Sequence, residues 1–253
     1  MIHARPIADE RATSVLGRTS PLVKLAIGFA WLLGLAFTLE HLPPVVITVA
    51  ALVAGILLGR IRAADLARAL IPLWSVALVV VVTNTVLGAA NTDPAATEIA
   101  RIGPLRVTAE AVEAATALGL RVVAIASVGV VFALTTEPTR LADALVQQAG
   151  VSDRFAFGAL AAYQAVPRFG DDLATLRQAR RIRGLPGSWH PRLLLSLLVL
   201  AIRHGDRVAL AMDARGFGSG PRTHVREVRW SWLDAVIGGA AVVVLAVALA
   251  LGR

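Results

Sequence analysis

The sequence has no cysteine and, among its 25 basic residues, only one lysine, Lys24. Without cysteine the chain can form no disulfide, no thiolate nucleophile and no cysteine-ligated metal site or cluster. A P-loop ATPase needs a lysine directly after a glycine-rich turn, whereas Lys24 follows the sequence Ser-Pro-Leu-Val. The chain is therefore not a P-loop ATPase, and any ATP that drives its function must be hydrolysed by another subunit.

Patterns for metal binding and acid–base chemistry are also scarce. The five histidines are scattered along the chain, at His3, His41, His190, His204 and His224. No two of them have the i, i+4 spacing of a helical metal pair. Asp171 and Asp172 are adjacent acids, but neighbouring positions of one helix point to different faces. No metal site, no cofactor and no enzyme active site, such as that of a lipid-headgroup transferase, is therefore expected.

Apolar residues, in contrast, are in excess, at 57% with a mean hydropathy of +0.70. Soluble domains are nearer to about 45–50% apolar. The excess lies in long uncharged runs, and crossing a bilayer takes about 20 such residues at ~1.5 Å each. The predicted spans are 25–39, 42–59, 69–90, 122–136 and 235–252. The fourth span also has an outer half, which begins at residue 111 and carries Glu113 and Arg121. The expected fold class is an all-α membrane protein with five transmembrane helices.

Two polar residues inside the predicted spans, Asn84 and Arg121, are functional candidates because intramembrane polar groups are costly. A structural interpretation is favoured for both. Asn84 can bond to a neighbouring helix, and Arg121 can extend toward the interface or pair with Glu113. No series of acids crosses the membrane, as a proton- or sodium-coupled carrier would usually need.

The distribution of arginine predicts the orientation. Segment 137–231 has fourteen arginines against eight acids, and segments 1–24 and 60–68 are also basic, whereas the opposite loops carry a net charge of −3. Because basic loops stay in the cytoplasm, we expect a multi-pass protein of the cell membrane with a cytoplasmic N-terminus and an extracellular C-terminus. The expected domains are a cytoplasmic segment 1–24, four spans in 25–136, a cytoplasmic segment 137–231 and a fifth span in 232–253. This topology explains the positive charge without nucleic-acid binding. The charged first twenty residues predict no cleaved signal peptide.

Capping signals predict three helices in segment 137–231, two of them long and crossing. Their expected bounds are 138–149, 153–183 and 191–215, with 188 as another start for the third. Pro167 is expected to kink the second helix. Small Ala201 and Gly205 on the third are expected to let the two long helices cross closely. The residues expected to pack against the second helix and the membrane domain are Leu194, Leu197, Leu198, Ala201, Gly205, Val208 and Met212.

A near-repeat closes the two long helices. The second ends in Ile182-Arg183-Gly184 and the third in Ala214-Arg215-Gly216, each followed by an apolar residue. For one such motif a structural interpretation suffices, because glycine favours helix ends and arginine in the last turn suits the helix dipole. Two motifs at consecutive helix ends favour docking, because arginine at a rigid end can form a bidentate pair with a carboxylate of another protein.

These residues resemble the transmembrane T component of energy-coupling factor (ECF) transporters, which take up vitamins and cobalt or nickel. The family carries two Ala-Arg-Gly signatures at the ends of its cytoplasmic coupling helices. Residues 214–216 match in full, and residues 182–184 match with isoleucine in place of alanine. The stretches 134–145, 163–169 and 21–25 are also similar. The resemblance is strong over roughly 134–217 and compatible elsewhere.

The resemblance implies a non-catalytic scaffold without a cofactor. Such a subunit joins a substrate-binding membrane protein, the S component, to two cytoplasmic ATPases of the ABC type, and Arg183 and Arg215 would each dock onto one ATPase. The alternative is a conventional ABC permease subunit that forms its own substrate pathway. A permease would usually have one short coupling helix between spans, which argues against it. The resemblance also implies that another subunit determines which vitamin or metal is transported.

Overall fold

The computed structural model describes residues 14–38, 40–102, 105–185, 190–218, 220 and 226–252. The chain divides into two units, of which the first comprises Met1–Glu137 with Arg229–Arg253 and the second Pro138–Val228. The relative position of the two units is not defined. The predicted segment 1–13, the end of the first predicted span at residue 39 and the alternative helix start at residue 188 lie outside the described residues.

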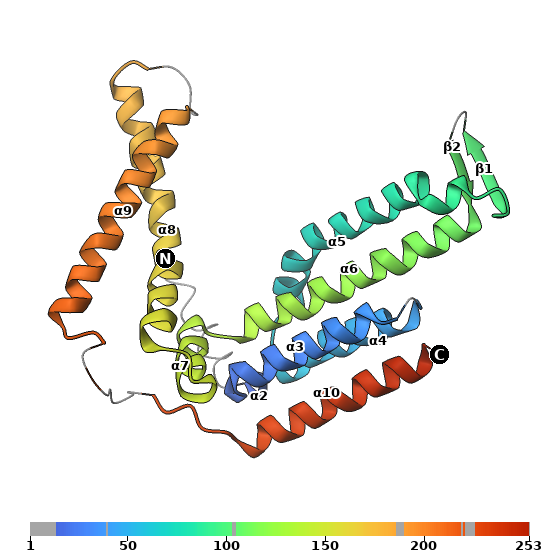
Figure 1. Ribbon diagram of the computed structural model, residues 1–253, viewed down its shortest axis with the longest axis horizontal. Coiled ribbons are helices and arrows are strands. Elements are labelled where there is room, and N and C mark those ends of the chain that lie inside the picture. The colour runs from blue at the N-terminus through green and yellow to red at the C-terminus, as the bar shows by residue number, and fades with distance from the viewer. Residues whose placement is uncertain are drawn as a thin grey trace. The chain divides into compact units, whose positions relative to one another are not determined.

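The first unit is built from apolar helices in the ranges predicted as spans (Figure 1). They are α3 (Pro21–Ala36), α4 (Leu42–Val53) with its π-helical continuation η1 (Ala54–Leu58), α5 (Ala63–Leu87), α6 (Ala109–Thr135) and α10 (Trp232–Leu251). Short helices α2 (Val15–Arg18) and η2 (Ala89–Thr92) flank α3 and α5. Among the described residues, Ala63–Thr92, Ala109–Thr135 and Trp232–Leu251 are long and apolar enough to cross a membrane, and α3 and α4–η1 are shorter.

Caps explain why these helices extend beyond the apolar runs. Proline at the first turn starts α3 and α4, where its missing N–H costs nothing. Thr108 caps α6 through its side chain, which accepts from the backbone N–H of Ala111. Ser231 and Asp234 form a reciprocal capping box at the start of α10. Charged residues near the apolar runs, including Lys24, therefore lie inside helices.

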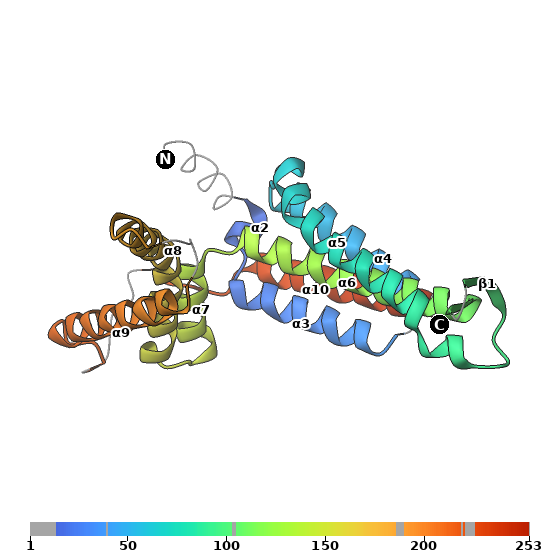
Figure 2. The same cartoon turned by 90° about the horizontal axis from the view of Figure 1, so that it is seen from above.

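One buried core of the first unit lies between α3, α4, α6 and α10 (Figure 2). Its buried members are Trp31, Leu35, Ile47, Ala51, Ala124, Ala241 and Ala248. Trp31 also donates its indole N–H to the carbonyl of Ala241, at 3.0 Å. Small residues let the helices approach closely, as expected where lipid supplies no hydrophobic driving force. Large apolar side chains such as Phe29 point outward, which suits membrane insertion.

An unpredicted β-hairpin interrupts the helical architecture between α5 and α6. Strand β1 (Glu98–Ile102) pairs antiparallel with β2 (Leu105–Thr108), with Arg101 opposite Arg106. The sequence does contain a hairpin signal, because apolar and polar residues alternate on both sides of Gly103-Pro104. The all-α expectation therefore needs this one correction.

The second unit consists of α7 (Pro138–Ala149), α8 (Asp153–Ile182) and α9 (Pro191–Ala214). These bounds agree with the predicted ones to within about one residue. Gly150, Gly184 and Gly216, which follow the three helices, adopt φ values of 67°, 68° and 70°. This left-handed conformation suits glycine and ends a helix. In Figure 1, α9 crosses α8 near the end where the two helices are joined, and the helices diverge toward their other ends.

The apolar face predicted for α9 is confirmed over its C-terminal part and wrong at two positions near its start. Leu197, Ala201, Val208 and Met212 are half-buried. Ala201, Val208 and Met212, together with Gly205, line the space toward α8. Leu194 and Leu198 are 55% and 56% exposed, whereas Leu193 is buried.

The close crossing expected at Gly205 is also wrong. A Cβ added there would meet no described atom within 4 Å. The facing turns of α8 are themselves small, with Ala161 and Ala165 opposite Ala201 and Gly205. Because the side chains on both helices are small here, they do not fill the space between α8 and α9. A cavity of about 330 Å³ remains between the two helices.

Candidate functional site

The Arg–Gly motif at the end of α8 is closed by backbone hydrogen bonds. Gly184 N–H donates to the carbonyl of Arg181 at 3.0 Å, and Leu185 N–H donates to that of Arg180 at 3.2 Å. This pair of bonds is the Schellman arrangement, which satisfies carbonyls that a helix end leaves unpaired. Arg183 is the C-cap residue, so its position is set by the backbone alone.

The end of α9 repeats this geometry. Gly216 N–H donates to Asp213 at 2.9 Å, and Phe217 N–H donates to Met212 at 3.0 Å. Arg215 is again the C-cap residue, with φ −93° and ψ 7° against −80° and 7° for Arg183. The sequence near-repeat is therefore also a structural repeat.

Both arginine side chains are exposed and available. Within the described part of the chain, neither Arg183 nor Arg215 forms an ion pair or a side-chain hydrogen bond. The helices run antiparallel, so the two ends lie at opposite ends of the α8–α9 pair (Figure 1). At ~1.5 Å per residue, the 24 residues of α9 separate them by ~36 Å, too far for one carboxylate to bind both.

The other motif positions lie beside these arginines. Ile182 is 87% exposed, so isoleucine in place of the family's alanine causes no steric conflict within this unit. Ala214 is exposed as well. Helix α8 continues through Pro167, which supplies no N–H to the carbonyl of Tyr163. The kink at Pro167, and its effect on Arg183, stay predictions.

Lys24 and Asp234 are two buried charges whose importance the sequence reasoning missed. Lys24 Nζ donates to the carbonyl of Thr135 at 2.8 Å, although only 7% of the residue is exposed. Asp234, 5% exposed, accepts from the backbone N–H of Ser20 at 2.7 Å and of Ser231 at 2.8 Å. The available signals were the single lysine and the Ser-x-x-Asp sequence before the last apolar run.

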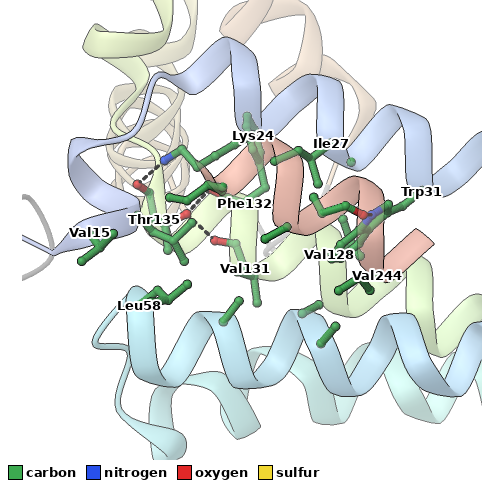
Figure 3. A pocket seen from close by; sticks show the side chains of 18 of the residues that line it. Val15, Lys24, Ile27, Trp31, Leu58, Val128, Val131, Phe132, Thr135 and Val244 are labelled. Atoms are coloured by element: carbon green, nitrogen blue, oxygen red, sulfur yellow. Dashed lines mark hydrogen bonds between the residues drawn. The ribbon is translucent and has the colours of Figure 1, made fainter. Parts of the chain in front are cut away.

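An apolar cavity of about 350 Å³ lies directly beside Lys24 (Figure 3). Side chains of α3, α4, α6 and α10 line it, and Lys24 and Thr135 form its polar end. Trp31 and Val128 lie further along the wall. Its lining suits hydrocarbon and offers no set of acids or histidines for chemistry.

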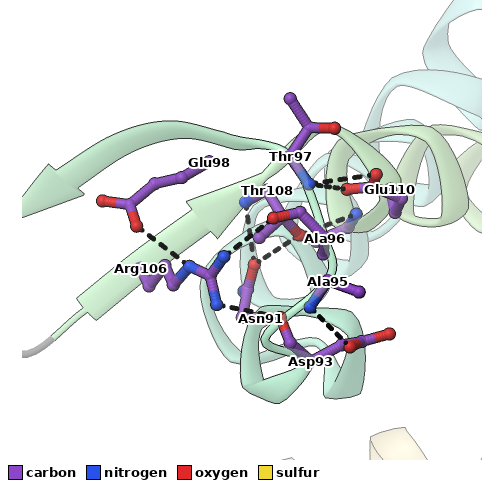
Figure 4. Close-up of polar contacts among 10 residues, drawn as sticks. Asn91, Asp93, Ala95, Ala96, Thr97, Glu98, Arg106, Thr108 and Glu110 are labelled. Atoms are coloured by element: carbon purple, nitrogen blue, oxygen red, sulfur yellow. Dashed lines mark hydrogen bonds and ion pairs between the residues drawn. The ribbon is translucent and has the colours of Figure 1, made fainter.

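The hairpin region is held by a polar network (Figure 4). Arg106 donates to Glu98 at 3.0 Å and to the carbonyls of Asp93 and Ala96 at 2.8 Å. Asn91 accepts from the backbone N–H and from the hydroxyl of Thr108. These groups satisfy one another, and the network fixes the loop that joins α5 to α6.

The intramembrane polar residues differ from expectation. Asn84 donates to the carbonyl of Val80 in its own helix at 2.9 Å, so the predicted bond to a neighbouring helix is wrong. Among the described residues Arg121 makes no ion pair with Glu113, and its Nε and Nη2 atoms are buried without a hydrogen-bond acceptor. No group of three or more described His, Cys, Asp or Glu residues could hold a metal ion; His3 and His224 lie outside the described residues.

Comparison with known proteins identifies the family of this chain. The family model described as cobalt transport protein, CbiQ, matches residues 12–225. The energy-coupling factor transporter transmembrane protein EcfT of Lactococcus lactis subsp. cremoris is 23% identical over 241 residues, 88% of each chain. EcfT of Acidaminococcus fermentans is 27% identical over 209 residues, 76% of each chain.

A third relative is longer. An ABC transporter ATP-binding protein of Bifidobacterium longum is 26% identical over 257 residues. The match covers 95% of this chain and 32% of that protein, so this chain spans about a third of its length. The match to the family model extends over most of the chain and includes both Arg–Gly ends. The chain therefore belongs to the CbiQ cobalt transport protein family, as a membrane protein of energy-coupling factor transport.

Proposed function

We propose that this chain is the T component of an ECF-type importer, a non-catalytic scaffold that couples ATP hydrolysis by two ABC-type ATPases to uptake of a vitamin or a transition metal through an S component. The observation that carries this proposal is the repeated helix end. Arg183 and Arg215 have the same backbone geometry, are exposed, and lie about one helix length apart. Two equivalent contacts at that spacing suit two similar partner subunits.

The relatives support the ATPase partners. The Bifidobacterium longum protein named as an ATP-binding protein contains a region similar to nearly this whole chain. In that protein the similar region and the remaining two thirds are one polypeptide. We infer that ATP is hydrolysed by ABC-type ATPases that contact the present chain, because the sequence of this chain has no P-loop.

Exposed apolar side chains on the second unit support a membrane-embedded partner. On α8, Phe155, Tyr163 and Val166 are 60–70% exposed. On α9, Leu195 and Leu210 are similarly exposed. Several large apolar side chains exposed on one pair of helices favour an interaction site. We assign it to the S component, whose contact is then separate from the Arg–Gly ends.

The proposed topology has five spans with segment 137–231 in the cytoplasm. The charge asymmetry and the helix positions support it. Helices α3 and α4–η1 have 16 and 17 residues, about 25 Å, slightly less than the ~30 Å of a hydrocarbon core. Local thinning of the bilayer accommodates such a mismatch at modest cost.

Labelling of single cysteines tests this topology directly, since the chain has none. Ile99→Cys lies in the hairpin and Gln178→Cys on α8, and both positions are exposed. A membrane-impermeant maleimide is expected to label Ile99→Cys in intact cells and Gln178→Cys only after permeabilisation. The reverse pattern would invert the topology, and labelling of both in intact cells would remove the cytoplasmic assignment.

Co-expression tests the function itself. When the tagged chain is produced with ABC-type ATPases and small apolar membrane proteins of its own organism, ATPases are expected to co-purify and to hydrolyse ATP. The purified chain alone is expected neither to bind nor to hydrolyse ATP. Saturable ATP binding by the chain alone, or uptake by cells lacking every such ATPase, would contradict the scaffold function.

A further inference from the structure

Two buried charges stand at the two points where the chain passes between the units. The chain leaves the first unit after α6 and returns just before α10. Thr135, the last residue of α6, accepts the hydrogen bond from Lys24. Asp234, in the first turn of α10, accepts the one from Ser20. Lys24 and Ser20 are one turn apart, so both connections are held by the same turn at the start of α3.

Each charge is matched to a helix end. The Thr135 carbonyl belongs to the last turn of α6, where unpaired carbonyls and the negative end of the dipole favour a cation. The Asp234 carboxylate lies at the positive end of α10 and also binds the N-cap residue of α3, Ser20. Buried charges are retained only where such bonds compensate their desolvation. The contacts are therefore charge-assisted hydrogen bonds, which an apolar side chain of equal size cannot form.

We propose that Lys24 and Asp234 are positioning residues for energy coupling. Their hydrogen bonds fasten two segments to α3: the outgoing connection, which follows α6, and the returning connection, which precedes α10. Displacement of α7–α9 is then transmitted to the membrane helices and is not lost in movement of these two connections. This consequence rests on the proposed function. The fastening itself is a property of the first unit and can be measured without transport.

Spin labels in the full-length chain test the fastening. A label on Glu137→Cys, exposed and directly after α6, reports the outgoing connection, and one on Val243→Cys, 61% exposed on α10, is the control. Lys24→Met keeps the apolar stem and removes the charge. It is expected to raise the mobility of the label at residue 137 several-fold and to leave that at residue 243 unchanged. Lys24→Arg, which still donates, is expected to restore the wild-type spectrum.

The assembled complex in proteoliposomes tests the consequence. Lys24→Met and Asp234→Asn are expected to lower substrate taken up per ATP hydrolysed several-fold while the ATPases stay bound, and Lys24→Arg to restore it. Leu25→Met, on the same helix and 43% exposed, is the matched control.

Three outcomes separate the two proposals. Unchanged mobility of the label at residue 137 in Lys24→Met overturns the fastening. If Lys24→Met is not produced, unchanged mobility of a label on Trp230→Cys, exposed just before α10, in Asp234→Asn overturns it. Altered mobility with unchanged uptake per ATP overturns its role in coupling. A wild-type chain that assembles with no ATPase overturns the proposed function, and the label measurement still decides the fastening.

Discussion

Replacing Arg183 and Arg215 together by glutamate is expected to release both ATPases from the complex. Removing one member of a buried charged pair at an interface costs roughly 2–5 kcal/mol, because its partner is left unpaired. That cost weakens docking by a factor of about thirty to several thousand at each site. Glutamate adds repulsion to this loss. A single Arg→Ala variant is expected to stay assembled through the other site, with transport reduced.

The double variant is expected to fold, because both helix ends are closed by backbone bonds and both arginines are exposed. Co-purification of the ATPases with the tagged variant is the measurement, and the S component is expected to remain bound. Arg177→Glu is the matched control, since Arg177 is exposed on the same helix but precedes its end. Retention of both ATPases by the double variant would mean that the Arg–Gly motifs only terminate helices.

Gly119→Leu is expected to disrupt the packing of α5 against α6, the two helices that contact each other most extensively in the described structure. A Cβ at residue 119 would overlap Cγ2 of Val81. Valine is stiff about χ1 and cannot move aside, so the helices must separate. Overpacking of this kind costs about 1–3 kcal/mol or more. In lipid, where packing itself drives association, little else offsets that loss.

The measurement is the amount of monodisperse protein and its thermal unfolding midpoint in detergent. Gly129→Leu is the control on the same helix, because a Cβ there meets no described atom within 4 Å. Gly119→Ala combined with Val81→Ala is expected to recover stability relative to Gly119→Ala alone. Equal stability of Gly119→Leu and Gly129→Leu would show that α5 and α6 do not pack this closely.

Local signals predicted the features that depend on local chemistry. Gly150, Gly184 and Gly216 marked the helix ends because each needs only a positive φ at one residue. The Arg–Gly repeat was visible for the same reason. The family assignment, confirmed by the match over residues 12–225, followed from the order of these short motifs.

Features that depend on distant residues escaped prediction. The partner of Lys24 lies 111 residues along the chain and that of Asp234 lies 214 away, so no spacing rule connects them. Leu194 was assigned to the covered face of α9 although it is exposed, because Leu193, Leu194 and Leu195 are chemically alike and only the packing of the helix decides which is buried. The cavity beside Gly205 was missed because the facing residues on α8 are also small.

The glycine that ends each of α8 and α9 has a consequence for how this family can vary. Each arginine is the C-cap residue of its helix, so its position is set by that helix. The distance between Arg183 and Arg215 therefore depends on the number of residues in α9 and not on the length of the joining loop. Insertions or deletions in that loop leave the interval intact. One residue added within α9 would turn Arg215 by about 100° around the axis. The length of α9 therefore sets both the distance and the relative direction of the two arginines.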